Sequence, residues 1–329
     1  MRRTLVLTAL CWGALSGCAL LPDGSEQLEP GTTIEFAGDL PEPYGSRGVE
    51  VRIPGARLIL QVSKRIVDPI EADALGRDTD VVADDGEELL LLHWVAATAD
   101  GSIRGLDPVT TTGRETAELT LVAGERREAL DVGWEDPRQA SAERGLVVTV
   151  PRDEPALLEV TVGEVTQVVD LDTQEVERPD ETRLLYQGIR SSEMMPCADT
   201  VVHPSRCFAE VREAPYVDEL GWAPADRPWW VVTVTASTED AGRYAVESVD
   251  VDVALAGRDE VTVLRPDVED GQDWEDREVS HWVFDEPGGA VEASVAYALR
   301  RVAGPASAPP TRTWRLGVRE PVVLDGTSR

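Results

Sequence analysis

The sequence is poor in histidine, in lysine and in long hydrophobic runs, and each shortage excludes a class of protein. The 329 residues include three histidines, His93, His203 and His281. None lies in a His-Glu-x-x-His zinc motif, and the chain has neither a Gly-x-Ser-x-Gly nucleophile elbow nor a phosphate-binding loop. No segment reaches the ~18 consecutive apolar residues that a membrane-spanning helix needs. We therefore expect a protein without catalytic residues, cofactor or metal.

Positive charge is also scarce. The chain has 62 acidic residues against 31 Lys and Arg, a formal net charge of −31, and Lys64 is its one lysine. Such a surface repels phosphate backbones, so nucleic acid is excluded as a partner. It also repels anionic lipid headgroups, and the folded part should therefore stand off a membrane. Because acids are so abundant, a carboxylate-dependent hydrolase stays open as an alternative function.

The N-terminus has the features of an export signal. Arg2 and Arg3 precede a short apolar run, which predicts a cleavable signal peptide over residues 1–17. The segment that ends it, Leu15-Ser16-Gly17-Cys18, resembles the lipobox of bacterial lipoproteins. An ordinary secretory signal followed by a chance cysteine is the alternative.

The lipobox resemblance implies a lipid anchor. In that family the cysteine receives a diacylglyceryl group and the signal is cut just before it, so Cys18 would become the mature N-terminus and the site of lipidation. Two acyl chains suffice for lasting membrane attachment, whereas one does not. We expect an extracytoplasmic protein at the bacterial membrane. Ala19 in place of Asp favours the outer membrane in a diderm host; in a monoderm host the protein would lie on the outer face of the plasma membrane.

Two further cysteines lie ten positions apart. In an oxidising compartment Cys197 and Cys207 are expected to form a disulfide that closes a small loop. Asp199 and His203 lie between them, so a zinc site is the alternative, although the second cysteine pair of a typical zinc finger is missing.

The chain divides into a tether and two strand-rich regions. Residues 18–48 are rich in Pro, Gly and acids and predict a flexible acidic tether. Short Val, Leu, Thr and Trp runs then alternate with polar residues between Gly, Pro and Asp clusters, which predicts strands. We expect an all-β protein with β-sandwich domains over 49–178 and 179–323, and a C-terminal tail over 324–329.

The two strand-rich regions look like copies of one unit. Four segments of the first match four of the second in the same order, and in one of them alternate residues are predicted to face a core. The matched segments are 57–61 with 183–187, 87–100 with 227–240, 146–162 with 282–297, and 166–171 with 311–316. About seven strands per unit are typical of an immunoglobulin-like sandwich. The order resembles tandem immunoglobulin-like domains of bacterial lipoproteins and surface antigens, which implies interaction surfaces and no general chemistry.

Two acidic loops and an aromatic cluster are the remaining candidate sites. Trp222 and Trp229 lie close together and predict either an interdomain contact or an aromatic platform for cell-wall glycan. Because neither acidic loop has EF-hand spacing, both are predicted to be solvated turns. Ca²⁺ binding is the alternative, since clustered carboxylates can supply its oxygen ligands. Their acids are Asp78, Asp80, Asp84, Asp85, Glu87 and Glu88, and Asp267, Glu269, Asp270, Asp273, Glu275 and Asp276.

Taken together, these features predict a lipid-anchored envelope protein that presents binding surfaces without catalysis. A scaffold, an adhesin or an accessory subunit would fit, and each implies a protein partner in the envelope. A Ca²⁺-binding or cell-wall glycan-binding module is the first alternative, and the hydrolase is the second.

Overall fold

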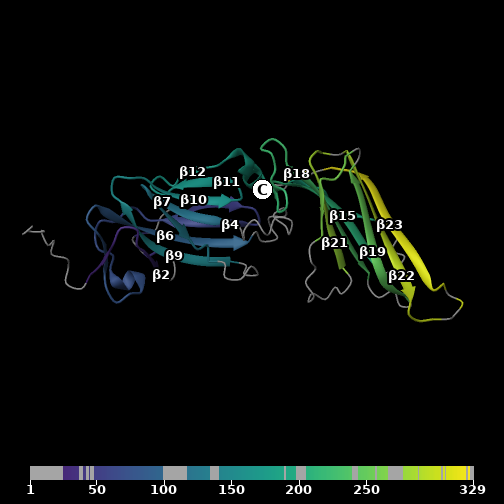
Figure 1. Ribbon diagram of the computed structural model, residues 1–329, viewed down its shortest axis with the longest axis horizontal. Coiled ribbons are helices and arrows are strands. Elements are labelled where there is room, and N and C mark those ends of the chain that lie inside the picture. The colour runs from purple at the N-terminus through teal and green to yellow at the C-terminus, as the bar shows by residue number, and fades with distance from the viewer. Residues whose placement is uncertain are drawn as a thin grey trace, which may run out of the picture.

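The protein consists of two β-sandwiches that follow each other along the chain (Figure 1). The computed structural model describes residues 25–36, 40–41, 44, 48–98, 117–133, 141–188, 190–197, 205–238, 244–255, 258–265, 277–287, 289–304, 307, 309–323 and 325–326. Within them, strands dominate and the α-helix α1 (Arg183–Gln187) spans five residues. The prediction of an all-β sandwich fold is confirmed.

The first domain has two facing antiparallel sheets. One has the order β2-β9-β6-β4-β3 and the other the order β12-β11-β10-β7-β8. The strands of the first sheet are β2 (Thr33–Phe36), β3 (Gly48–Ile53), β4 (Ala56–Val62), β6 (Glu87–Thr98) and β9 (Ser141–Pro151). Those of the second are β7 (Glu118–Ala123), β8 (Arg126–Leu130), β10 (Ala156–Val162), β11 (Val165–Asp170) and β12 (Val176–Glu177). A parallel pair, β1 (Glu26–Leu28) with β5 (Val81–Ala83), and the 3₁₀ helix η1 (Ala72–Leu75) lie outside these sheets.

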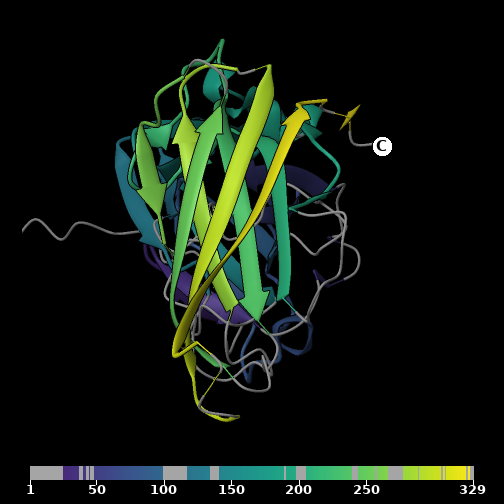
Figure 2. The same cartoon turned by 90° about the vertical axis from the view of Figure 1, so that its right-hand side faces the viewer.

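The second domain repeats this plan with a smaller second sheet. Its larger sheet has the order β20-β21-β18-β15-β13-β24, with β14 also on β15, and its smaller sheet has the order β19-β22-β23. The larger sheet contains β13 (Arg190–Ser191), β14 (Met195–Pro196), β15 (Ser205–Ala214), β18 (Trp229–Thr238), β20 (Thr262–Leu264), β21 (Arg277–Phe284) and β24 (Asp325–Gly326). The smaller one contains β19 (Tyr244–Leu255), β22 (Ala290–Arg301) and β23 (Thr311–Pro321), which lie toward the viewer in Figure 2.

Each domain has its own hydrophobic core between its two sheets. Which residues enter the core depends on their alternate positions along each strand, because successive side chains of a strand point to opposite faces of the sheet. In β6, Leu90, Leu92, Trp94 and Ala96 point into the first core, as predicted. The corresponding residues of β18 belong to the second core; they are Trp230, Val232, Val234 and Ala236.

Three of the four matched segments occupy equivalent places in the two domains. β6 and β18 are central strands, β9–β10 and β21–β22 each run from one sheet to the other, and β11 and β23 each pair with the strand before them. The match of 57–61 with 183–187 is wrong. The first segment belongs to strand β4, whereas the second is helix α1, which follows the 3₁₀ helix η4 (Asp180–Thr182).

The predicted tether is structured over part of its length. β2 pairs with β9 from Thr33 to Phe36, so residues within 18–48 belong to the first domain. Leu28, Phe36 and Leu40 are buried in a second cluster of this domain, against the outer face of β6. The prediction of a flexible segment is therefore wrong for these residues, because they cover apolar side chains that would otherwise face water. Residues 1–24, including the predicted signal and Cys18, lie outside the described residues.

Candidate binding groove at the edge of the second domain

A groove of about 550 Å³ lies on one edge of the second sandwich, where the segment from β13 to β14 faces the end of β23. Two methionines from the β13–β14 segment and aliphatic side chains from the end of β23 line it, together with two carboxylates. The lining residues are Ser192, Glu193, Met194, Met195, Pro196, Val318, Glu320, Pro321 and Val323. The two sheets of the sandwich thus contribute opposite walls.

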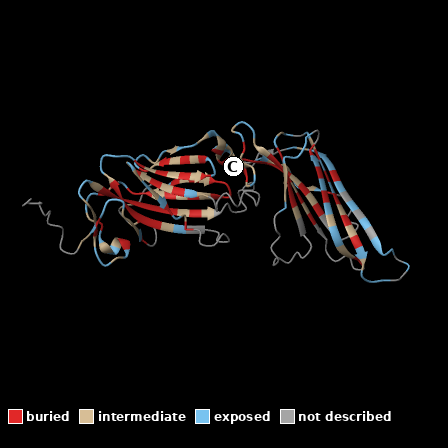
Figure 3. Ribbon diagram, viewed as in Figure 1, coloured by how far each residue is buried: buried red, intermediate tan, exposed pale blue. Residues whose placement is uncertain are grey.

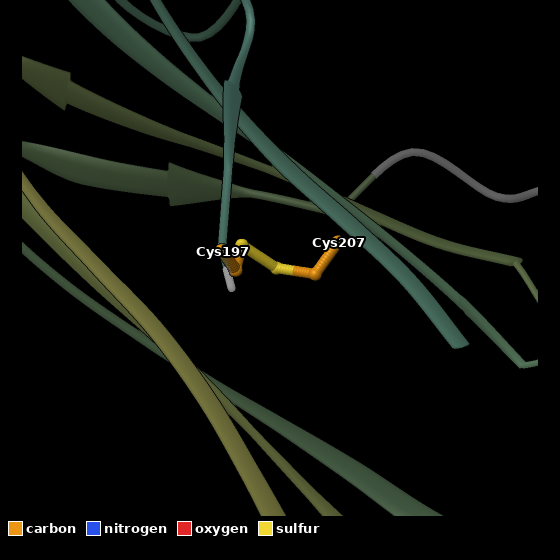
Figure 4. Close-up of a disulfide and its surroundings, with 2 residues drawn as sticks. All are labelled: Cys197 and Cys207. Atoms are coloured by element: carbon orange, nitrogen blue, oxygen red, sulfur yellow. A yellow bond between two sulfur atoms is a disulfide. The ribbon is translucent and has the colours of Figure 1, made fainter. Parts of the chain in front are cut away.

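The disulfide holds one wall of the groove in place. Cys197 and Cys207 are bonded, with Cα atoms 5.2 Å apart, and both side chains are buried in the second core (Figure 4). The Cys197 amide also donates to the Cys207 carbonyl at 2.9 Å, so β14 is tied to β15 through backbone and side chain. The disulfide prediction is confirmed; because the sulfurs are bonded to each other, the zinc alternative is excluded.

Ser192 fixes the start of the same wall. Its amide donates to the Val211 carbonyl at 2.7 Å, and its Oγ accepts from the Val211 amide at 2.9 Å. The chain rejoins β15 at Met195, opposite Ala209. Glu193 and Met194 lie between these two anchors, which accounts for their outward position.

The groove carries two of the most exposed apolar side chains of the described chain. Met194 is 67% exposed and Val323 is 64% exposed, whereas Val318 below them is 9% exposed. Met195 packs partly against the second core. Flexible, polarizable methionines adapt to the shape of a ligand, and exposed apolar patches commonly mark binding sites.

An open sheet edge borders the groove. β23 pairs with β22 along its whole length, and within the described residues no strand pairs with its other edge. In the first domain, the equivalent strand β11 has β12 on that edge, with Val169 opposite Val176. Figure 3 shows the resulting contrast, with many exposed residues along β23 and few in the first sandwich.

The predicted aromatic site is divided between two places. Trp222, in the hairpin of β16 (Tyr216–Val217) and β17 (Gly221–Trp222), donates through Nε1 to the Val162 carbonyl of the first domain at 2.8 Å. Its ring packs edge-on against Tyr216, which belongs to the first core, at a centroid distance of 5.5 Å. Trp222 therefore lies in the contact between the domains, and its indole N–H is used there.

Trp229 does not take part in that contact. Its Nε1 donates to the Gly221 carbonyl at 3.1 Å, and its ring packs against a small cluster within the second domain. In the match of 87–100 with 227–240, Leu89 is the counterpart of Trp229 in the first domain, and it does not take part in the contact either. Leu89 is covered by the N-terminal segment of its own domain, as described above.

Tyr186 of helix α1 makes a second contact at the junction. Its hydroxyl donates to Gln167 Oε1 at 2.6 Å and accepts from the Arg52 amide at 2.9 Å. The guanidinium groups of Arg52 and Arg178 lie 5.6 and 4.2 Å from its ring centre. The helix is thereby fixed to the first domain, and the chain leaves it toward β13 and the second domain. Sequence matching missed this role because it treated 183–187 as a strand.

The histidines that the structure describes are buried within strands. His93 is 1% exposed, on the face of β6 that the N-terminal segment covers, and its Nε2 lies 3.0 Å from Glu143 Oε1. His281 is 3% exposed, and its Nδ1 lies 2.9 Å from Thr233 Oγ1. His203 lies outside the described residues. Both described histidines therefore have hydrogen-bonding partners inside the sheet.

Acids of the first acidic loop take part in local structure. Asp80 accepts from the Ala72 amide at 2.9 Å, Asp84 accepts from Gln27 at 2.6 Å, and Glu87 pairs with Arg126 at 2.6 Å. The second acidic loop lies outside the described residues. In the part of the chain that is described, no three His, Cys, Asp or Glu side chains are grouped so that they could hold a metal ion.

Comparisons with known proteins give no match. No family model matches the chain, and neither a curated protein nor a solved structure is significantly similar to it. Over the described residues, no helix has both the length and the hydrophobicity to cross a membrane.

Proposed function

We propose that this chain is a lipid-anchored, extracytoplasmic envelope protein that binds a partner protein at the groove of its second domain. Its role is that of a scaffold, an adhesin or an accessory subunit, and it acts by binding rather than by catalysis. The single observation that carries the proposal is the exposure of Met194 and Val323 over a groove whose walls are fixed by a disulfide and a sheet. Exposed apolar side chains that lie together at a groove commonly mark a binding site.

The anchoring part of the proposal rests on the lipobox resemblance at Cys18. A diacylglyceryl group would hold the protein at the membrane, and the first domain would then lie between the anchor and the groove along the chain. Cys18→Ser should release the protein from the membrane fraction into the extracytoplasmic soluble fraction. Retention of this variant in the membrane fraction would contradict lipid anchoring at this residue.

The binding part is tested by crosslinking in intact cells, followed by mass spectrometry of what the protein captures. We expect one stoichiometric envelope protein with the native chain and its loss with Met194→Glu, because a buried charge opposes apolar contact. Val67→Glu is the matched control, since Val67 is an apolar side chain of the first domain that is 59% exposed. Equal capture by both variants would contradict binding at the groove.

A further inference from the structure

The outer edge of β23 offers a row of backbone groups that can pair with another strand. From Thr311, opposite Arg300, to Pro321, opposite Ala290, one edge is satisfied by β22. The other edge has no strand partner within the described residues. Unpaired N–H and C=O groups of this kind are a template for an added strand.

The first domain shows how the fold fills this position. There β11 carries β12 on the equivalent edge, antiparallel, with Val168 opposite Glu177. In the second domain the chain after β23 turns away instead. β24 pairs with β13 in the opposite sheet, where Gly326 lies opposite Arg190. Among the residues that the structure describes, the edge of β23 thus has no strand beside it, although the first domain accommodates an antiparallel strand at the equivalent place.

The side chains of β23 define what such a strand must contain. Arg315 lies opposite Ala296 and Arg319 opposite Glu292, both on the exposed outer face of the sheet. The side chain of Arg319 is 80% exposed, and its Nε lies 3.8 Å from Glu292 Oε2, so the two form a long, weak ion pair. Val318 points the other way, into the groove. Opposite charges directly across two strands stabilise the pair, and like charges destabilise it.

Arginine and proline on an edge strand also discourage unspecific pairing. Here the two arginines also favour an added strand of opposite charge. Basic residues placed opposite Arg315 and Arg319 would be repelled, whereas acidic residues there would be attracted. The net charge of −31 does not prevent this, since charges beyond a Debye length of ~8–10 Å are largely screened by salt.

We infer that the open edge of β23, which borders the groove, binds an extended segment of the partner protein as an added antiparallel strand, with acidic residues opposite the two arginines of the outer face. This inference rests on the proposed function and specifies its partner. Residues opposite Arg319 and Arg315 are acidic, and the residue opposite Val318 is apolar. Read from its N-terminus, the segment therefore has the pattern acid–apolar–x–x–acid.

The test is selection of binders from a random nine-residue peptide library on the full purified chain in detergent. We expect enrichment of the acid–apolar–x–x–acid pattern. The double variant Arg315→Glu/Arg319→Glu should weaken the selected peptides at least about tenfold and should itself select basic residues at the two acidic positions. Arg265→Glu is the control, because it changes the charge of an exposed loop residue outside the groove and should leave affinity unchanged.

Backbone hydrogen exchange provides the second readout. A selected peptide should slow exchange of amides in β23 and leave those of β11 unchanged, because β12 already occupies that edge. The inference would be overturned if the selected peptides lacked the pattern or if the double arginine variant bound them as tightly as the native chain. It would also be overturned if a bound peptide did not slow exchange in β23. If cellular capture still depends on Met194 in that case, the proposed function stands without strand addition. If capture does not depend on Met194, the proposed function fails whatever the peptides show.

Discussion

The two domains share a plan but differ in how much of their surface the chain itself covers. In the first, β8 and β12 occupy the edges of the five-stranded sheet that contains β10 and β11, and the N-terminal segment covers the outer face of β6. In the second, the described residues give the corresponding sheet the strands β19, β22 and β23, and β23 borders the groove. A strand edge and an apolar groove are common means of protein recognition, and this difference is why we propose that the partner binds at the second domain.

The largest expected effect tests whether the two cores are separate. Trp94 is 1% exposed in the first core, and its Nε1 donates to the Val132 carbonyl at 3.1 Å. Trp94→Ala should cost the first domain about 3–5 kcal/mol of unfolding free energy, because it leaves a large cavity. Calorimetry should show one transition lowered and the other unchanged. An equal fall in both transitions would mean that the domains unfold as one unit.

The next effect belongs to the second domain alone. The double variant Cys197→Ser/Cys207→Ser removes the disulfide that links β14 to β15. Its two cysteines lie ten positions apart in the sequence. The chain-entropy model predicts a loss of about 3 kcal/mol for a loop of this size. We expect the second transition in calorimetry to fall and peptide binding at the groove to weaken with it. Unchanged binding would show that the disulfide does not position the Met194 wall.

The smallest effect is a pH dependence confined to the first domain. Arg65 donates to Asp172 at 2.6 Å and to the carbonyls of Pro151 and Glu154, which connects three turns at one end of the sandwich. The hydrogen bond from Arg65 lowers the pKa of Asp172. The ion pair therefore stabilises the fold above the unfolded-state pKa of ~3.9, and this stability is lost as the pH falls through the lower folded-state pKa.

Asp172→Asn should accordingly cost about 1 kcal/mol near neutral pH and less than that in acid, because the pair is partly exposed. Denaturant titrations of the native and variant chains at pH 7 and near pH 3 would measure the two differences. The second transition serves as the internal control and should not change. A larger cost in acid than at neutral pH would contradict the sign of the pKa shift.

The core-facing residues of the two central strands were predicted correctly. In β6 and β18, the aligned alternate residues belong to the two cores, as expected, because successive side chains of a strand point to opposite faces of the sheet. The segment 183–187 was wrongly matched with strand β4, because five residues of mixed polarity are too few to distinguish a strand from a helix. Its preceding Pro179 and Asp180 fit the short helical turn that the structure contains.

The N-terminal cover was missed for a different reason. Composition suggested disorder, but the continuous run from Leu89 to Leu92 carries a contrary signal, since a strand that is apolar on both faces must be covered on both. The groove could not be predicted at all. It depends on where the β13–β14 segment meets the end of β23, a tertiary relationship that neither segment encodes locally.

The central claim is that the second domain, at its open edge, is where a partner binds. A photo-activatable residue in place of Met194, compared with one in place of Val67, tests this most directly in living cells. We expect one strong crosslinked species from position 194, mapping to a single extended segment of the partner, and none from position 67. Equal crosslinking from both positions, or none from position 194, would contradict it.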